Sequence, residues 1–270
     1  MSELSSRYAR ALVTGARSGL GKAFALRLMA EGIEVWGSSR MPDAFENLPG
    51  INPVLVDLNR EKELSKWYQD LDRRAGGFDL LVNNAGFGAF GKFGDFRDED
   101  IQSQLRVLLT SPMQLALGAI KCMRARKRGC IVNISSMAGS LWIPFFSSYN
   151  AGKAGLSAFS QSLMLEAPAT PPWIIDFCPG DLATPFNRST VRRGEPSGRL
   201  QRVWRRIEQN TEAALPPQRA AEDLMGGLKR FRHCTLHSGS FLQRIMARLG
   251  ARLVPTGCKR TALRRYFDLH

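Results

Sequence analysis

The sequence predicts an α/β fold in which a doubly wound parallel sheet carries helices on both faces. Short apolar runs alternate with helix-like stretches over the first two-thirds of the chain, as expected for successive βαβ units. A glycine-rich turn follows the first apolar run, and a Ser–Tyr–Lys series follows a later one. Because parallel strands end at one edge of a sheet, we expect these motifs to meet there.

Length and composition bound the class of protein. A chain of 270 residues can bury one full core, and nothing requires a second domain. The five cysteines form no CxxC pair, which favours reduced thiols and a cytoplasmic setting. No signal peptide is recognised, and no apolar run reaches the roughly 18 residues of a membrane span. We expect no metal site, since His233, Cys234 and His237 lack ligand spacing and are expected in a loop.

The formal charge of +14 is unusual for a soluble enzyme and unevenly placed. Residues 181–270 contain 18 Lys or Arg against 7 Asp or Glu. Such a region attracts phosphorylated ligands, acidic carrier proteins, anionic lipid or nucleic acid, and the charge alone does not choose among them. No nucleic-acid-binding module is recognised, so nucleic acid is not an expected partner.

The first strand is predicted at residues 11–13, followed by TGARSGLG at 14–21 and a helix that ends at Gly32. In a strand–turn–helix unit, backbone N–H groups and the helix N-terminus receive a pyrophosphate. The glycines are spaced Gly-x3-Gly-x-Gly rather than GxGxxG. The turn by itself is a weak signal, because any tight turn favours glycine.

A second strand, predicted at residues 33–37, ends in Ser38, Ser39 and Arg40. Folds that prefer NAD place an acid near this point to bind the ribose 2′-hydroxyl. Here Ser39 and Arg40 take that place, and Arg17 lies in the glycine turn. A guanidinium pairs with a 2′-phosphate, so we predict NADP(H) over NAD(H). The alternative for Arg40 is an ordinary exposed arginine.

Two more strands are predicted at residues 53–58 and 78–82, with a helix at 60–75 between them. Asp57 lies at the end of the third strand, and Asn-Asn-Ala-Gly at 83–86 follows the fourth. Right-handed crossovers bring these ends to the edge that carries the glycine turn.

The stretch at residues 131–153 contains the candidate catalytic groups. An apolar strand ends in Ser135 and Ser136, and Tyr149 and Lys153 follow. On a helix, a four-residue step puts the phenol and the ammonium on one face. Lys153 is expected to lower the pKa of Tyr149 from about 10 towards neutrality, which makes the phenol a usable acid or base. Each residue alone could be purely structural: an interfacial aromatic, a helix-capping serine or a solvated lysine. The series indicates catalysis only if a cofactor site exists upstream.

Taken together, TGARSGLG, NNAG, Ser136 and Tyr149-x3-Lys153 make residues 8–190 resemble the short-chain dehydrogenase/reductase family, in its compact single-domain branch. The resemblance implies a Rossmann-type fold with Tyr149 as acid/base, Lys153 on the nicotinamide ribose and Ser136 on the carbonyl. It also implies oxidoreduction of a CH–OH or C=O group and a homodimer or homotetramer. The implied cofactor-binding residues are Gly15, Arg17, Ser18, Gly19, Leu20, Gly21, Ser39, Arg40, Asp57, Leu58, Asn83, Ala85, Gly86, Tyr149, Lys153, Pro179, Gly180, Leu182 and Thr184.

One position departs from the family pattern. Leu108 stands where the family has an asparagine that holds a proton-relay water. Leucine has no polar atom for this task, so we expect a slower proton supply without loss of hydride transfer. Ser111 or a backbone carbonyl is the candidate replacement for holding the water.

The chain is expected to be one domain over residues 1–270, with a variable substrate loop at about 186–218 and a basic helical extension at about 219–270. An apolar wall at residues 142–146 and a basic mouth suit a hydrophobic carbonyl compound, with an anionic group or carrier as an open option. The alternative is that the aromatics form core or interface and the arginines are solvated. The predicted basic mouth consists of Arg192, Arg193, Arg199, Arg202, Arg205 and Arg206.

Two further basic segments stand out. Residues 240–255 have the pattern of a basic amphipathic helix interrupted or ended near Gly250, which either lies on an anionic membrane surface or packs on its own domain or a sister subunit. Residues 123–129 form a basic run before the catalytic strand, where carrier-linked ketoacyl reductases of this family meet an acidic carrier. The leading expectation is an NADPH-dependent carbonyl reductase. A cofactor-binding regulator or scaffold, and a ketoacyl-carrier-protein reductase, stay open as alternatives.

Overall fold

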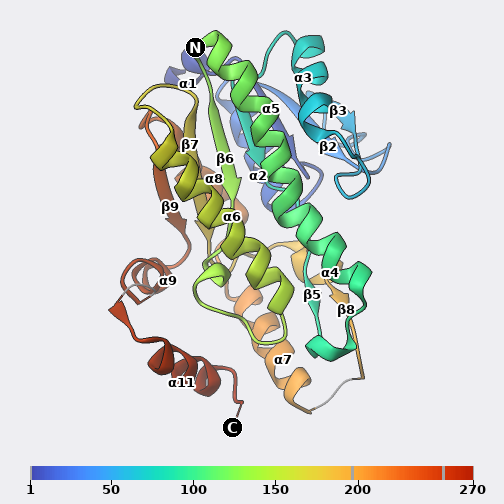
Figure 1. Cartoon of the computed structure of the whole chain (residues 1–270), viewed down its shortest axis with the longest axis vertical. Helices are drawn as coiled ribbons and strands as arrows, with labels where there is room; N and C mark the ends of the chain where they lie inside the picture. Colours follow the sequence, from blue (N-terminus) through green and yellow to red (C-terminus); the bar gives the residue numbers. More distant parts are fainter. Residues whose placement is uncertain (1, 196–197, 251–252, 270) are drawn as a thin grey trace.

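Seven parallel strands form the central sheet of the computed structural model, which describes residues 2–195, 198–250 and 253–269 (Figure 1). The strand order is β3-β2-β1-β4-β6-β7-β9, so the chain reverses its direction of winding between β1 and β4. This confirms the predicted doubly wound α/β fold and puts a crevice at the carboxyl ends of β1 and β4. The strands are β1 (Arg10–Thr14), β2 (Glu34–Ser39), β3 (Ile51–Leu55), β4 (Leu80–Asn83), β6 (Cys130–Ile134), β7 (Trp173–Pro179) and β9 (Cys234–Ser238).

Helices cover both faces of the sheet because its central strands are buried on both sides. The short α1 (Glu3–Arg7), α2 (Gly19–Ala30) and α8 (Pro217–Leu228) enclose one apolar core with residues such as Phe24 and Phe177. On the opposite face, α3 (Leu64–Ala75), α5 (Ser111–Arg126) and α6 (Ser147–Glu166) enclose a second core around Tyr68 and Phe78.

The predicted elements lie where the sequence pattern placed them, with shifted ends. The second strand runs from Glu34 to Ser39 rather than over residues 33–37. The third strand stops at Leu55, and the following helix starts at Leu64 instead of residue 60. A turn intervenes, in which the Arg60 and Glu61 amides both donate to the Asp57 carbonyl at 3.0 Å.

The predicted helical extension over residues 219–270 needs correction, because its first part belongs to the sheet. α8 packs on α2, and β9 pairs with β7 as the seventh strand. Cys234 and His237 therefore lie in β9 and not in a loop. Only Leu236 and Ser238 of this edge strand are buried. The strand therefore lacks an apolar run, and the sequence pattern did not predict it. The helical extension begins at Phe241, with α9 (Phe241–Ile245), the π-helical turn η5 (Met246–Gly250) and α11 (Thr256–Tyr266).

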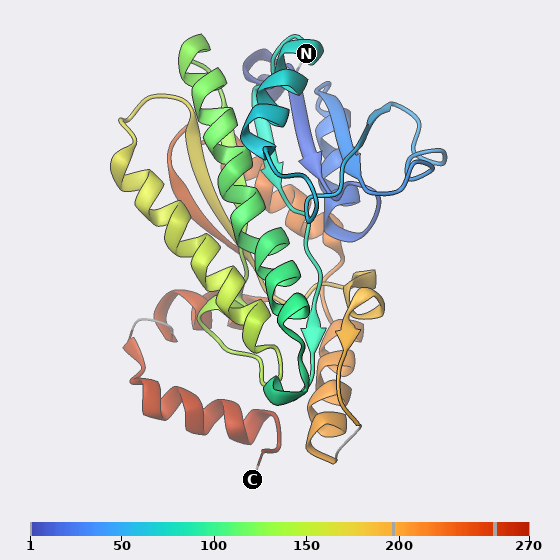
Figure 2. The same cartoon turned by 45° about the vertical axis from the view of Figure 1, so that its right-hand side comes forward.

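A second layer lies beyond the carboxyl edge of the sheet, at the lower end of the molecule in Figure 2. It contains a two-stranded sheet of β5 (Ala89–Phe90) and β8 (Val191–Arg192) together with α7 (Gly198–Glu212) and α11. Short connecting helices complete it: η1 (Phe93–Asp95), α4 (Asp98–Leu105), η2 (Arg106–Thr110), η3 (Met137–Gly139) and η4 (Pro185–Ser189).

None of the helices in the described part of the chain is long and apolar enough to cross a bilayer.

Candidate active site

Ser136, Tyr149 and Lys153 converge just beyond the carboxyl end of β6. Ser136 is the second residue after β6 and caps η3, its hydroxyl accepting the Ala138 amide at 3.1 Å. Tyr149 lies in the first turn of α6, with its phenol hydrogen-bonded to Ser136. Lys153 lies one turn later, with its Nζ 5.9 Å from the centre of the Tyr149 ring. The helical spacing thus brings the three predicted groups together.

Burial raises the pKa of Tyr149 to about 12, although the hydrogen bond to Ser136 opposes the shift and the charge of Asp181 adds to it. The expectation that Lys153 moves this pKa towards neutrality is therefore not met in the structure. The Lys153 ammonium donates instead to the Ile134 carbonyl at 2.6 Å. A phenol in this setting keeps its proton at neutral pH and is ready to act as an acid.

Burial lowers the pKa of Lys153 to about 8, because the low-dielectric surroundings disfavour the ammonium. The negative charge of Asp176 acts in the opposite direction. Asp176 lies in β7 and is fully buried. The sequence analysis did not identify Asp176 as a residue of the site. The signal was present, since an acid inside an otherwise apolar parallel strand needs partners.

Asp176 has those partners on two neighbouring elements. Its carboxylate accepts hydrogen bonds from Ser135 at 2.5 Å, from Ser157 at 2.6 Å and from Gln161 at 3.1 Å. Ser135 precedes Ser136, and the other two donors lie on α6, the helix that carries Tyr149 and Lys153. Asp176 therefore ties the end of β6 to the helix that carries the candidate catalytic groups.

The glycine turn and the NNAG segment are joined at the crevice between β1 and β4. The Thr14 hydroxyl accepts the Asn84 and Ala85 amides at 2.9 and 3.0 Å. The Asn84 side chain donates to the Thr14 carbonyl at 2.8 Å. These bonds hold the Ala85-Gly86 backbone beside the turn, where Gly15 adopts a φ of +66°.

The glycine turn is packed closely against its neighbours. A Cβ on Gly21 would collide with the Gly15 carbonyl and the Asn84 amide nitrogen, so the N-terminus of α2 packs closely on the turn. On the other side, a Cβ on Gly19 would lie 3.5 Å from Thr184 Cβ. The turn therefore faces Thr184, in the segment that runs from the last residue of β7 onward and contains the predicted Pro179, Gly180, Leu182 and Thr184.

The residues predicted for the adenosine end lie at the ends of β2 and β3. Arg17 and Arg40 are exposed, and neither makes an ion pair with another residue that the structure describes. The Ser39 hydroxyl accepts the Met41 amide at 3.1 Å. Asp57 is half-buried, accepts the Asn59 amide at 2.9 Å and lies 3.6 Å from Arg60.

Comparisons with known proteins agree with this geometry. The sequence profile of the short chain dehydrogenase family matches residues 9–194. The chain belongs to the short-chain dehydrogenase/reductase family of oxidoreductases.

A similar protein of this family is the 3-ketodihydrosphingosine reductase of Bacteroides thetaiotaomicron, 33% identical over 178 residues. The match covers 65% of this chain and 64% of that reductase, so it spans less than two-thirds of its length. A solved short-chain dehydrogenase from Streptomyces avermitilis superposes with a TM-score of 0.80 at 25% identity, covering 100% of this chain and 98% of that one. The actinorhodin polyketide ketoreductase, a variant solved with NADPH, reaches 0.71 at 26% identity, covering 88% and 97%.

Asn83 is the predicted cofactor residue whose side chain points elsewhere. It is buried and donates to Asn133 at 2.8 Å and to the Pro112 carbonyl at 3.3 Å. Asn133 in turn donates to Ser160 of α6 at 2.9 Å. The Asn83 amide therefore links β4 to β6 and α6 within the sheet, and a cofactor role for this residue stays a prediction. Leu58 is also buried, whereas Leu20 and Ser18 lie at the surface of the turn.

Leu108 is predicted to stand at the place of the family asparagine, and that equivalence stays a prediction. It is fully buried in η2, against Gly86 of the NNAG segment and Gly152 beside Lys153. The Ser111 hydroxyl, the suggested replacement for holding a water, is buried and donates to the Leu58 carbonyl at 2.8 Å. The Ser111 hydroxyl therefore donates its proton to the loop that contains Leu58.

An apolar cluster adjoins Tyr149, and we call it the substrate cluster. Phe186 and Phe146 lie 5.5 and 5.8 Å from Tyr149 between ring centres, and Phe90 lies 4.9 Å from Trp204. The predicted wall at residues 142–146 contributes Phe145 and Ile143, so the wall and the loop meet as expected. The cluster consists of Phe90, Ile143, Phe145, Phe146, Phe186, Leu200, Val203, Trp204, Ile207, Leu263, Phe267 and Leu269.

The predicted basic mouth is largely engaged within the protein. Arg192 stacks on Trp204 at 3.9 Å. Arg193 makes two hydrogen bonds to Asp100, at 2.6 and 2.7 Å, and this holds the pKa of that carboxyl well below its usual range. These contacts fix the substrate loop to α4 and α7.

A smaller part of the mouth stays open at the outer side of α7. Arg202 pairs with Asp268 at 3.1 Å, and Arg206 lies over Tyr266 at 5.2 Å. A cavity of about 150 Å³ here is lined by Arg202, Arg205, Arg206, Gln209, Phe267 and Asp268.

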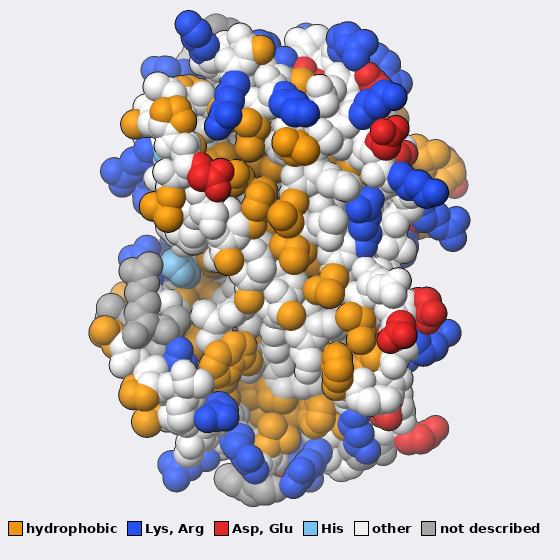
Figure 3. Space-filling model, in the orientation of Figure 1, with side chains coloured by type: hydrophobic (Ala, Val, Ile, Leu, Met, Phe, Trp, Pro, Cys, Tyr) orange, Lys and Arg blue, Asp and Glu red, His pale blue; other side chains and the backbone are white. Residues whose placement is uncertain are grey.

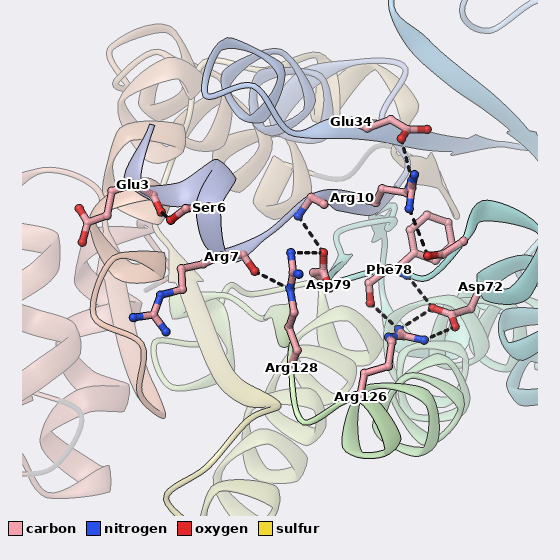
Figure 4. Close-up of polar contacts among 12 residues, drawn as sticks. Glu3, Ser6, Arg7, Arg10, Glu34, Asp72, Phe78, Asp79, Arg126 and Arg128 are labelled. Carbon is pink, nitrogen blue, oxygen red and sulfur yellow. Dashed lines mark hydrogen bonds and ion pairs between the residues drawn. The ribbon is translucent and has the colours of Figure 1, made fainter. Parts of the chain in front are cut away.

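The second basic run, residues 123–129, lies at the opposite edge of the sheet, before β6 begins. Figure 4 shows that Arg126 binds Asp72 through two hydrogen bonds and that Arg128 binds Asp79. Both arginines also donate to backbone carbonyls at 2.9 Å. This run stabilises the amino-terminal edge of the sheet, away from Tyr149.

Asp181 is a second acid that sequence reasoning passed over. It follows Pro179-Gly180, and burial raises its pKa. Gln243 of α9 donates to its Oδ2 at 2.8 Å. The helical extension is thereby tied to the segment that borders the cofactor crevice. No group of His, Cys, Asp or Glu in the described residues is arranged to hold a metal ion.

Proposed function

We propose that the chain is an NADP(H)-dependent oxidoreductase that reduces a hydrophobic ketone or aldehyde, or carries out the reverse alcohol oxidation. The observation that carries the proposal is the meeting of Ser136, Tyr149 and Lys153 beside the substrate cluster. When bound, NADPH supplies the hydride. The glycine turn and the segment from Pro179 to Thr184 are the residues that would hold it.

The three side chains have separate roles in this proposal. Ser136 orients the carbonyl oxygen of the substrate, and Tyr149 donates a proton to it. With a pKa of about 12, Tyr149 is a phenol at neutral pH, which favours the reductive direction. Lys153, with a pKa of about 8, is mostly protonated there and carries the positive charge beside the phenol.

Arg40 and Arg17 support NADP(H) over NAD(H), because both are exposed at the crevice without an internal ion pair among the described residues. Replacing Arg40 by alanine removes a charge-assisted bond to a 2′-phosphate. We expect NADPH binding to weaken by about tenfold or more, with NADH binding unchanged. Fluorescence titration measures both dissociation constants. Arg73→Ala, at an exposed arginine of α3, is the control, and tighter binding of NADH than NADPH by the native chain would contradict the assignment.

The reaction is tested by NADPH oxidation against aliphatic, aromatic, steroid-like and acyl-thioester carbonyls. Tyr149→Phe removes the proton donor and keeps the ring in its contacts with Phe146 and Phe186. We expect at least about a thousandfold loss of turnover with NADPH binding retained. Unchanged activity of this variant would refute the mechanism.

Leu108 favours a second candidate, a cofactor-binding regulator or scaffold with weakened catalysis. Its buried isobutyl group leaves no polar atom at the place of the family asparagine. Retention of all three catalytic groups speaks against this candidate, since a scaffold has no chemical need for them. Tight NADPH binding with no turnover on any carbonyl in the panel would decide in its favour.

A carrier-linked ketoacyl substrate is a further option within the same chemistry. The basic run at residues 123–129 does not support it, because Arg126 and Arg128 are paired internally at the far edge. Activity on the acyl thioester alone would favour it.

We also propose that the chain forms a homodimer or homotetramer. Met113 and Leu117 on α5 and Leu165 on α6 are exposed apolar side chains on adjacent helices. Figure 3 shows apolar side chains along the middle of the face on which these helices lie. Sedimentation equilibrium measures the number of subunits.

A further inference from the structure

The helical extension exposes large apolar side chains at one end of the molecule. Phe241 and Leu242 of α9 are 73% and 68% exposed, and Leu253 is 74% exposed. We call the exposed apolar residues of this segment the α9 surface: Phe241, Leu242, Ile245, Met246, Leu253 and Val254. Buried core residues of the sheet, by contrast, leave almost nothing to solvent. An exposed apolar surface of this kind marks a site of interaction.

Basic side chains surround the α9 surface. Arg248, Arg260, Arg264 and Arg265 are exposed, and none forms an ion pair within the described residues. Residues 241–270 contain seven Lys or Arg and a single acid, Asp268, which pairs with Arg202. Figure 3 shows apolar and basic side chains interspersed at the lower left, where α9 and α11 lie. Exposed apolar side chains flanked by arginines are typical of a helix that lies in a bilayer interface.

The charge distinguishes among possible occupants. A second copy related by a two-fold axis would place this basic segment against itself, and like charges would oppose the contact. An anionic bilayer matches both the charge and the apolar side chains of this segment. Its phosphate headgroups pair with the arginines, and its acyl region takes up the apolar side chains.

The same segment is attached to the active site. Gln243, which follows the exposed Leu242, donates a hydrogen bond to Asp181. Leu263 and Phe267 of the extension belong to the substrate cluster, which also packs against Tyr149. Lys259 lies over Trp142 at 5.6 Å. A molecule leaving the bilayer beside α11 would meet apolar side chains that continue to the catalytic phenol.

We propose that the α9 surface and its arginines dock on an anionic phospholipid bilayer, and that the substrate is a carbonyl lipid taken from it. The second clause rests on the proposed function; the docking does not. Arg248, Arg260, Arg264 and Arg265 bind the headgroups, and Phe241 and Leu242 enter the interface.

The test is co-sedimentation of the full chain with vesicles, without NADPH or substrate. The vesicles contain phosphatidylcholine alone or phosphatidylcholine with phosphatidylglycerol. We expect binding to the anionic vesicles that weakens with salt, and at least about tenfold weaker binding for the double variant Phe241→Ser/Leu242→Ser. Replacing Arg264 by glutamine should weaken binding by about fivefold. The matched control is Met41→Ser/Leu55→Ser, two exposed apolar residues at the far edge of the sheet, which should bind as the native chain does.

Equal binding by the native chain and the Phe241→Ser/Leu242→Ser variant, or no binding of a natively folded chain at low salt, would overturn the docking. So would a self-association that this variant abolishes in the absence of vesicle binding, because a second copy would then occupy the surface. Turnover of a short soluble carbonyl separates the two proposals. The variant should keep that turnover and lose turnover of a vesicle-borne carbonyl lipid. Vesicle binding without any carbonyl reduction would refute the proposed function and leave the docking intact.

Discussion

At the scale of single residues, burial shifts the pKa values of the two titrating candidate catalytic groups, Tyr149 and Lys153, in opposite directions. The charged forms are phenolate and ammonium, so the same low-dielectric surroundings raise the pKa of Tyr149 and lower that of Lys153. The active site therefore holds a proton on the phenol, and it loses the proton on Lys153 first as the pH rises. Reduction should accordingly decline above about pH 8, the pKa of Lys153.

Asp176 sets where that decline occurs. Its negative charge raises the pKa of Lys153 against the effect of burial. Asp176→Asn removes the charge, so the pKa of Lys153 should fall and the alkaline limb of kcat/KM should move to lower pH. The measurement is the pH profile of carbonyl reduction, with thermal melting as the check on folding.

Ser157→Ala is the control for this prediction. It removes one hydrogen bond to Asp176, at 2.6 Å, and leaves the carboxylate in place. Its alkaline limb should stay where it is in the native chain. An Asp176→Asn profile with the native midpoint would show that the charge of Asp176 does not act on Lys153.

At the scale of elements, the N-terminus of α2 depends on a glycine that leaves no room for a side chain. Gly21→Ala would press a methyl group against the Gly15 carbonyl and the Asn84 amide. We expect the free energy of unfolding to fall by about 1–3 kcal/mol and NADPH binding to weaken by at least about tenfold. Denaturant unfolding and fluorescence titration measure the two effects.

Gly226→Ala makes the same substitution at a helix position where a methyl group has room. Gly226 lies inside α8, is exposed, and a Cβ there would meet no atom within 4 Å. This variant should gain about 0.4–1 kcal/mol and bind NADPH as the native chain does. If Gly21→Ala behaved like Gly226→Ala, the close packing of α2 on the turn would not matter for the cofactor.

At the scale of the whole molecule, the C-terminal segment completes a core that begins more than a hundred residues earlier. Phe267 is 5% exposed and packs in the substrate cluster with Phe90 and Trp204. Phe267→Ala should lower the free energy of unfolding by about 3–5 kcal/mol. Tyr266→Ala, at a neighbouring residue that is 46% exposed, should cost only about 1 kcal/mol. Denaturant unfolding measures the free energy of unfolding of both variants. Equal losses of stability would contradict the packing of the C-terminal segment through Phe267.

Periodicity in the sequence was enough for most of the sheet. The runs before Thr14 and Asn83 are apolar throughout, and the run before Ser135 is broken only by Asn133, because these strands are buried on both faces. Edge strand β9 was missed for the converse reason, since solvent on its outer side removes the apolar run. Element ends shifted where a turn, such as that of Asp57 to Glu61, replaced part of a predicted helix or strand.

The sequence by itself determined the fold class, the family and the spacing that unites Ser136, Tyr149 and Lys153, because local periodicity and motif order follow from neighbours along the chain. The tertiary structure alone decided the opposite pKa shifts, the internal pairing of Arg126, Arg128 and Arg193, and the contacts of Asp176 and Gln243 with the site. Burial and pairing depend on residues distant in sequence, which no local pattern records.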